Sequence, residues 1–507
     1  MKAVMTLPEL SVSVAGSALD PADLAALAEV RVQQRLSMPT VCQLVFVDPP
    51  GPLPTLVTMP PGAELRIGVS GFDNALFSGD VTAIEQVYGA ERAREIRVRA
   101  YDRMHRLRKR HQVRTHVHIT PRSLAEELVA DIGLSVESED DGPVWEMLIQ
   151  DRQSDLELLT ETLEFCGLHY TVREDVLHLM TLKGLDDPVS LHLGETLLEA
   201  TIQVNGDPAC RTVSISGWDP LTAATHTGEA SVGRIPLSPM DEVAPDQLGG
   251  DGNLFFVNEG LWTEEHADAV AGAELDHRLV AEATVEGLAQ GDSSLRPGAV
   301  IDVEGVDDAI ADRFVLTAVD HLVDVRTGFV SKVSSQPPVR GQRSRTAAVT
   351  IGIVTRVDDP ESKGRVKVRL TTIGNLETGW IEVVATAAGP GKGLVALPAV
   401  NDTVLVLLPF EDPAAGLVLG GLYGAAGAPI AGGVDAGAVR VFALLTSGGM
   451  SLTFDDAHQQ IRLQDAAGSY LEFAKDAVVL QAATNIEIAA PGKQIRIRAA
   501  AVEFETA

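Results

Sequence analysis

The last third of the chain alternates apolar and other residues in very short steps. From residue 452 onward, seven pairs of apolar residues each enclose one intervening residue: Leu452/Phe454, Ile461/Leu463, Leu471/Phe473, Val478/Leu480, Ile486/Ile488, Ile495/Ile497 and Val502/Phe504. Gly, Asp, Asn or Pro mark most of the turns between the pairs. Because side chains two positions apart share one face of a strand, each pair predicts a short β-strand with one apolar side.

A strand this short cannot bury its apolar side within one chain. Repeats from several chains can bury it, because the inward pairs then close a common core and the strand edges pair with one another. We therefore expect residues 440–507 to form an obligate oligomeric needle whose core consists of the fourteen apolar residues named above.

The segment before the needle predicts a small barrel. Five strand-like runs, at 349–357, 364–371, 379–385, 403–409 and 416–423, match the five-stranded Greek-key barrel called the OB-fold. A linker rich in Ser, Pro, Gln and Arg precedes it at 334–348, and an Ala/Gly hinge follows it at 425–439. We place the OB-fold at residues 349–424.

Several short motifs in this barrel follow one another in a specific order. They are Gly364 to Val368, Trp380, Leu397-Pro398, Asn401 to Val406, Asp412-Pro413 and Leu419 to Tyr423. Their order and spacing resemble those of VgrG spike proteins and phage baseplate hubs. A barrel followed directly by a short β repeat also resembles the trimeric central spike of contractile injection systems. An OB module with an unrelated β tail is the alternative.

The first third of the chain predicts a further barrel. Strand-like runs at 29–36, 41–47, 65–68, 76–84 and 95–100 indicate a first β-barrel over residues 1–120. Within it, Phe77 to Val81 and Val98 to Asp102 resemble the opening domain of the hub families. A second β region, 185–333, has runs at 298–301 and 314–321 that resemble the closing strands of the family's second barrel.

Helix signals separate these two β regions. Thr120 with Pro121 begins one helix that ends before Gly133, and the capping box from Ser154 to Glu157 begins another that stops at Gly167. With strands at 170–172 and 176–180, these helices indicate a connector domain over residues 121–184. A third helix, capped by Thr263, is expected at 264–282.

The fold class is therefore mainly β with minor α: two hub β-barrels, an OB-fold barrel and a C-terminal trimeric β-helix or β-prism needle. The resemblance implies a homotrimer at the centre of a baseplate. Two similar barrels per chain then give six around the axis, which adapts a three-fold spike to a six-fold inner tube.

Charge and cysteine content limit the possible partners and the cellular compartment in which the protein is assembled. Asp and Glu number 71 against 40 Lys and Arg, a net charge of −31 that repels phosphate backbones, so we expect no nucleic-acid partner. Cys42, Cys166 and Cys210 are widely spaced, as expected for buried thiols in a reducing compartment. Without a signal-peptide pattern or an apolar run of about 18 residues, assembly in a bacterial cytoplasm is expected, followed by incorporation into an injection particle.

Two charged stretches each leave two interpretations open. Residues 103–118 hold six Arg or Lys and four His, typical of a solvated connector face or of a surface for an anionic partner. Within them, alternation would place His116 and His118 on one strand face as a metal pair, although no third ligand is nearby. Residues 235–277 hold ten acids and no Lys or Arg, which indicates a solvated insertion or a docking face for a basic partner.

No motif for catalysis, a cofactor or a metal is present, so we expect no enzyme and no cofactor. Asp358-Asp359 and Asp455-Asp456 stand where turns favour Asp. Two function classes remain: a structural spike and hub, or a trimeric β-helical adhesin or carbohydrate-binding module. An adhesin would need an exposed aromatic platform, whereas nearly all aromatic residues of the needle are in the inward register. A short needle and the lack of enzyme domains favour a phage-tail-like extracellular particle over type VI secretion.

The C-terminal end of the needle is expected to bind a tip. A needle that stops at Phe504 leaves open strand edges and an apolar cross-section, so Phe504, Glu505, Thr506 and Ala507 are the predicted tip-binding residues. The resemblance implies a PAAR-like tip protein that brings its own metal. It also implies inner tube and baseplate proteins as partners, effector cargo, and the target membrane on injection.

Overall fold

The computed structural model describes residues 8–49, 59–89, 94–219, 221–222, 224–236, 244–307, 310–341 and 346–505. The chain divides into two compact units, Met1–Gly421 and Leu422–Ala507. The fold is mainly β, as predicted. Within the described ranges, no helix is both long and apolar enough to span a membrane.

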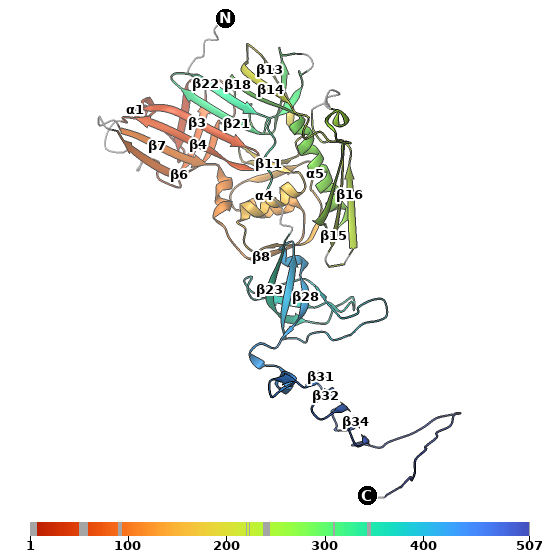
Figure 1. Ribbon diagram of the computed structural model, residues 1–507. Helices are drawn as coiled ribbons and strands as arrows, with labels where there is room; N and C mark the ends of the chain where they lie inside the picture. The colour runs from red at the N-terminus through yellow and green to blue at the C-terminus, as the bar shows by residue number, and fades with distance from the viewer. Residues whose placement is uncertain are drawn as a thin grey trace. The chain divides into compact units, whose positions relative to one another are not determined.

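One large sheet runs through the two β regions of unit 1 (Figure 1). Its strand order is β14-β18-β22-β21-β3-β4-β7-β6-β5-β1-β2. The bounds are β1 (Leu10–Val14), β2 (Ser17–Ala18), β3 (Leu27–Arg35), β4 (Met38–Val47), β5 (Glu64–Val69), β6 (Phe77–Tyr88), β7 (Arg94–Tyr101), β14 (Leu197–Val204), β18 (Ala283–Gln290), β21 (Ala318–Asp324) and β22 (Gly328–Ser334), with the short helix α1 (Pro21–Ala25) before β3.

The first five predicted strands are present as β3 to β7, and their alternation explains the core. In β4, Cys42, Leu44 and Phe46 are fully buried, and their neighbours on β7 are Ala100, Val98 and Ile96. The two β regions join where β3 pairs antiparallel with β21, and an ion pair between Arg31 and Asp320 at 2.5 Å crosses this seam. The sequence had not shown this shared sheet.

The connector region lies between them in the chain, and residues 103–119, placed in the first barrel by the sequence, share its core. Its elements are the 3-10 helix η1 (Arg103–Lys109), β8 (Arg114–Ile119), α3 (Pro121–Val129), β9 (Ser135–Ser138), β10 (Trp145–Gln150), α4 (Asp155–Phe165), β11 (His169–Arg173) and β12 (Val176–Met180). Both predicted helix starts are confirmed: Thr120 caps α3, and Ser154 and Glu157 form the capping box of α4. The apolar sides of the two helices share one core with Tyr170 of β11.

The second β region contains two smaller sheets and a long helix. The elements are β13 (Leu185–His192), β15 (Thr212–Asp219), β16 (Ala224–Ala230), η2 (Pro245–Leu248), β17 (Asn253–Gly260), α5 (Glu264–Glu282), β19 (Ala299–Glu304) and β20 (Arg313–Val315). The helix α5 has the predicted bounds and the predicted Thr263 cap, and it lies along the sheet of β15 and β16 (Figure 1).

Two predictions for this region need correction. The run 314–321 is two strands, because the backbone N–H of Leu316 donates to Ala299 O whereas that of Thr317 donates to Ser334 O, so the chain changes partner sheets there. The acidic stretch is not a solvated insertion over its last part, since α5 buries Ala267, Ala271 and Leu275 against the sheet.

The barrel of residues 347–422 closes on itself. Its order is β25-β24-β23-β27-β28-β26, and paired backbone hydrogen bonds between Val366, next to β24, and Ile381, next to β26, close the ring. The bounds are β23 (Ala347–Arg356), β24 (Lys367–Leu370), β25 (Leu376–Glu377), β26 (Glu382–Val383), β27 (Thr403–Pro409), η3 (Pro413–Ala415) and β28 (Leu417–Leu422). Its core contains Val354, Val368, Val404 and Val406.

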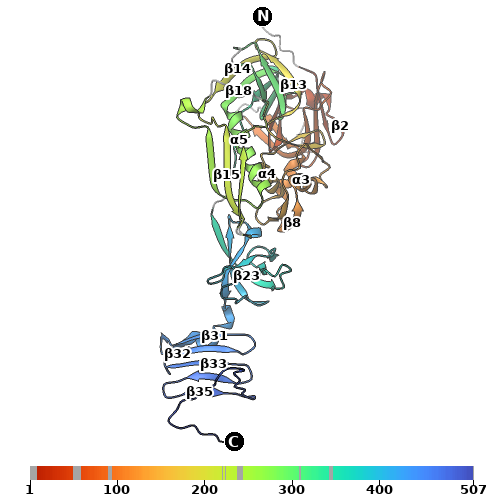
Figure 2. The ribbon, with the colours of Figure 1, turned by 90° about the vertical axis from the view of Figure 1, so that its right-hand side faces the viewer.

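Unit 2 is built from short elements. They are η4 (Gly424–Ala426), η5 (Pro429–Gly433), β29 (Val434–Asp435), β30 (Ala438–Val439), β31 (Val441–Leu445), β32 (Ser451–Asp455), β33 (Gln460–Gln464), β34 (Tyr470–Phe473) and β35 (Val478–Gln481). The last five form one antiparallel sheet in chain order, with the strands stacked one after another (Figure 2).

The predicted strands at 486–488, 495–497 and 502–504 are absent from this single chain. A strand is defined by hydrogen bonds to a neighbour, and the sheet ends at β35, so the later pairs have no partner strand within the chain. The prediction of a strand at every apolar pair is therefore wrong for one chain alone.

Candidate functional site

The sheet of unit 2 gathers ten apolar side chains on one face. Directly paired residues point to the same side of an antiparallel sheet, and so do residues two apart along a strand. The register therefore produces two parallel rows. One row is Phe442, Phe454, Ile461, Phe473 and Val478, and the other is Leu444, Leu452, Leu463, Leu471 and Leu480.

Most of these side chains are exposed in the single chain. The exposed fractions are 61% for Phe442, 59% for Leu444, 56% for Leu463 and 65% for Val478. Isolated exposed apolar residues are ordinary, but a contiguous face of ten is typical of an interaction surface. We call this surface the apolar face of unit 2.

The opposite face of the same sheet carries polar side chains that pair with one another. Arg462 pairs with Glu472 at 3.1 Å and lies over the ring of Tyr470, 3.9 Å from the ring centroid. The hydroxyl of Tyr470 donates to Gln481 Oε1 at 2.7 Å. The two faces therefore differ in kind: one is apolar and mostly exposed, and the other is polar with side chains that pair with one another.

The predicted core residues divide into two groups. The first eight, from Leu452 to Leu480, lie together on the apolar face, and their place in a trimer core stays a prediction. The last six, from Ile486 to Phe504, are exposed by 49% to 92% and lie outside the sheet. Phe504 and Glu505 of the predicted tip-binding end are exposed, whereas Thr506 and Ala507 lie outside the described residues.

Sequence reasoning missed one pair of the face. Phe442 and Leu444 on β31 pair with Phe454 and Leu452 and extend both rows. The signal was present, because Phe442 and Leu444 have the same two-residue spacing as the later pairs. Val441 and Leu445 of β31 are also apolar, so the alternation of Phe442 and Leu444 is hard to recognise in the sequence.

The basic stretch is matched by acids of the same chain. Arg106 pairs with Asp80 at 2.7 Å, Arg110 with Asp131 at 2.8 Å and Arg114 with Asp155 at 3.0 Å. Asp80 and Asp155 are buried, so these are ion pairs that join η1 and β8 to β6 and α4. These arginines are therefore engaged within the chain rather than free to bind an anionic partner, although the pair of Arg110 with Asp131 lies partly in solvent.

The proposed histidine pair does not share a strand face. His116 is buried, with Nδ1 3.1 Å from Glu127 Oε2, whereas the side chain of His118 is 72% exposed. His118 has a positive φ of 53°, which breaks the alternation of β8 at that position. Among the described residues, no group of three or more His, Cys, Asp or Glu could hold a metal.

Two further expectations concern buried or turn-forming groups. Cys42, Cys166 and Cys210 are buried free thiols, and burial raises the pKa of the Cys42 thiol. Asp359 accepts from the backbone N–H groups of Glu361 and Lys363, and Asp455 from that of His458, so both hold turns as predicted.

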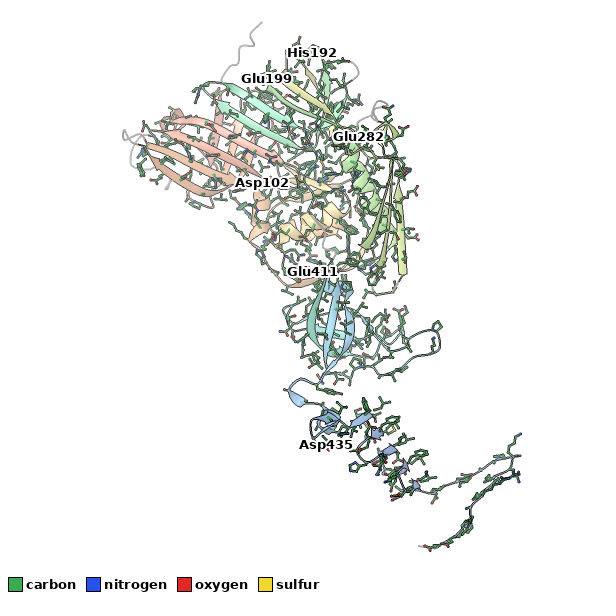
Figure 3. All side chains as sticks on the ribbon, in the orientation of Figure 1. Asp102, His192, Glu199, Glu282, Glu411 and Asp435 are labelled. Carbon is green, nitrogen blue, oxygen red and sulfur yellow. The ribbon has the colours of Figure 1, made fainter. Side chains whose placement is uncertain are left out.

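Within unit 1, the barrel contacts the connector region. Arg152 pairs with Glu411 at 3.2 Å, and the rings of Trp218 and Phe410 lie 6.1 Å apart. Figure 3 marks Glu411 at the end of the barrel where this contact forms. Ile149 of β10 packs into the barrel's own core. The barrel is thus held by packing as well as by its linker.

Two family models match the chain. The model described as the type VI secretion system/phage-baseplate injector OB domain matches residues 350–423, and that of the Alg8 N-terminal domain matches residues 5–324. A comparison with curated proteins gives no match.

Solved structures show the same fold at low identity. A type VI secretion system component from E. coli, c3393, is described as structurally similar to the T4 phage tail proteins gp27 and gp5. It is 14% identical to this chain with a TM-score of 0.54, covering 81% of this chain and 99% of its own. The lidded Francisella PdpA-VgrG complex is 9% identical with a TM-score of 0.54, covering 95% of this chain and 81% of that one. The chain thus has the fold of VgrG-like baseplate spike proteins, as the sequence resemblance indicated.

Proposed function

We propose that this chain, which belongs to the family of the Alg8 N-terminal domain, is the structural spike and hub of a contractile injection system. The observation that carries the proposal is the apolar face of unit 2, which follows directly after a barrel of the injector OB type. A sheet with ten apolar side chains on one side is suited to close against copies of itself.

The proposed assembly is a homotrimer. Three sheets arranged around an axis place their apolar faces inside and the faces with Arg462 and Glu472 outside. Each chain also brings two β regions, joined through β3 and β21, so a trimer presents six of them around the axis. In this proposal the hub adapts a three-fold spike to a six-fold inner tube.

The proposed role is mechanical, without catalysis and without a cofactor of its own. The partners are the inner tube, the baseplate, a PAAR-like tip protein, effector cargo and, on injection, the target membrane. Assembly takes place in a bacterium before incorporation into the particle, which we propose to be of the extracellular phage-tail-like type.

Imaging of native particles tests this role. Cryo-EM of purified particles should place three copies of the chain on the axis between the inner tube and the tip, and deleting its gene should give particles without that density. A chain found on peripheral fibres would instead identify the adhesin alternative.

The lower needle gives a prediction about register. We expect Ile488, Ile497 and Phe504 to face the three-fold axis and Glu487, Arg496 and Glu503 to face water, because a slip of one residue would bury three charges. Ile497→Asp should then open the lower needle to limited proteolysis beyond residue 481, whereas Arg496→Asp should leave the cleavage pattern unchanged. Equal cleavage in both variants would contradict the predicted register.

The end of the needle gives a prediction about the tip. Phe504 is 92% exposed in the single chain, so the end of a trimer would present three such rings. Removing residues 502–507 should abolish co-purification of a small tip protein while the trimer persists. A particle in which these residues converge to a closed apex with nothing bound would contradict the tip assignment.

A further inference from the structure

A small polar cavity of about 50 Å³ lies where the three hub regions of unit 1 meet. Its wall includes Gln34 of β3 and Ser78 of β6 from the first region, Arg173 of β11 from the connector, and Arg296 and His321 from the second β region. Figure 3 marks Asp102, another wall residue, where the N-terminal strands meet the connector. The space is enough for one small ion or a few water molecules.

Arg173 has unused hydrogen-bond donors in this cavity. Its side chain is buried, and Nη1 bonds to Asp186. The other two nitrogens, Nε and Nη2, are buried without a hydrogen-bond partner in the described part of the chain. An unpaired donor on a buried charged group is costly, so it indicates a partner that the protein chain itself does not supply.

The loop beside the guanidinium of Arg173 turns at a glycine that packs closely against Met180. Gly298 has a positive φ of 87°, and a Cβ built there would lie 3.4 Å from Arg173 Nη2 and 2.6 Å from Met180 Sδ. A larger residue would therefore be strained in its backbone and would displace Met180. The loop that ends at Gly298 carries Arg296.

Arg296 adds a second positive charge beside the first. It is half-buried, and its side chain has neither an ion pair nor a hydrogen bond among the described residues. Burial, and then the nearby charge of Arg173, lower its pKa. Two guanidinium groups close together in a poorly hydrated place are unfavourable unless an anion lies between them.

The carboxylates at the cavity do not serve as the anion between Arg173 and Arg296. Asp102 accepts from the backbone N–H groups of Thr40 and Met104, so both of its carboxylate oxygens already have partners, and burial raises its pKa to about 6. Glu174 is exposed to solvent, and Asp186 is already engaged at Nη1 of Arg173. Arg66, which is exposed, also lines the cavity, so three arginines and two carboxylates, Asp102 and Glu174, contribute to its wall.

His321 contributes no positive charge to the wall. Its Nδ1 lies 2.8 Å from Ser331 Oγ, and burial lowers its pKa to about 4, so the ring is neutral at pH 7. His321 is therefore a neutral, buried residue of the wall whose Nδ1 already has Ser331 as its partner.

We propose that this cavity binds a small inorganic anion, of the size of chloride or phosphate, between Arg173 and Arg296. Such an anion would connect β11 of the connector region with the loop before β19 and with the N-terminal strands. It would act as a clamp on the hub, independent of the needle and of any tip protein.

The test compares anions at equal ionic strength on the full-length protein. The melting temperature (Tm) would be measured in sodium bromide, sodium phosphate and sodium gluconate, the last being too large for the cavity. The site predicts a Tm that is higher by about 2 °C or more in bromide or phosphate than in gluconate. Bromide and phosphate compared with each other identify which anion is preferred.

The key variant is Arg296→Met, which keeps the length of the side chain and removes its charge. It should abolish the difference between anions and raise the Tm in gluconate, because Arg173 then has no like charge beside it. The matched control is Arg326→Met, an exposed arginine in the β21–β22 turn, which should keep the full anion response.

Crystals grown in bromide give a direct readout. An anomalous peak between Arg173 and Arg296 in the wild type, and none in Arg296→Met, is the expected result. The proposal is overturned if wild type and Arg296→Met respond equally to the anions, or if only water occupies the cavity at high bromide. Neither outcome bears on the spike role, which depends on unit 2.

Discussion

Leu463→Asp is expected to convert the assembled protein into monomers. Leu463 sits in the middle of one row of the apolar face, with Leu452 and Leu471 as its paired neighbours. Each chain would lose the burial of one leucine, about 1.5–3 kcal/mol. Each would also place a carboxylate in an apolar core, at a further cost of several kcal/mol. A trimer would incur both costs three times, once in each chain.

The matched control is Thr453→Asp on the opposite face of the neighbouring strand. Thr453 pairs directly with Arg462, so the new carboxylate faces a guanidinium and lies on the solvated side. Sedimentation velocity at micromolar concentration should show a trimer for this variant and a monomer for Leu463→Asp. If both variants stay trimeric, the apolar face is not the interface.

The second large effect is expected from removing the needle. Deleting residues 440–507 should give monomers or weak oligomers, because this segment carries the whole apolar face. Unit 1 should stay folded, since its apolar cores are closed within residues 12–418. Circular dichroism should therefore show little loss of structure from unit 1 while the mass falls to one chain. A shortened protein that remains a tight trimer would place the main interface in the hub.

Local signals in the sequence were reliable wherever a side chain binds the backbone next to it. The caps at Thr120, Ser154 and Thr263 each begin a helix at the predicted residue, because their partners lie within three positions. Period-two alternation also placed β4 and β7 correctly, since one face of each strand is buried.

Features that depend on distant partners could not be predicted. The seam between β3 and β21 joins residues almost 300 positions apart, and the sequence of neither strand identifies the other as its partner. The arginines after Asp102 were interpreted as a surface for the same reason, because the buried acids Asp80 and Asp155 that pair with them lie elsewhere in the chain.

The needle shows the same division between local and distant information. The apolar pairs from Leu452 to Leu480 gave the correct face, because alternation alone fixes which side chains share it. The pairs from Ile486 onward have the same pattern but no strand in the single chain, since their hydrogen-bond partners are not within it. In a trimer we expect those partners to come from the other two chains.

The central claim is that three copies of the chain close their apolar faces around one axis. Cryo-EM of the purified full-length protein tests it most directly. The account predicts a trimer in which Phe454 and Leu463 of all three chains point at the axis and Arg462 points to solvent. A monomer, or a trimer with Arg462 inside and the two apolar rows facing water, would contradict it.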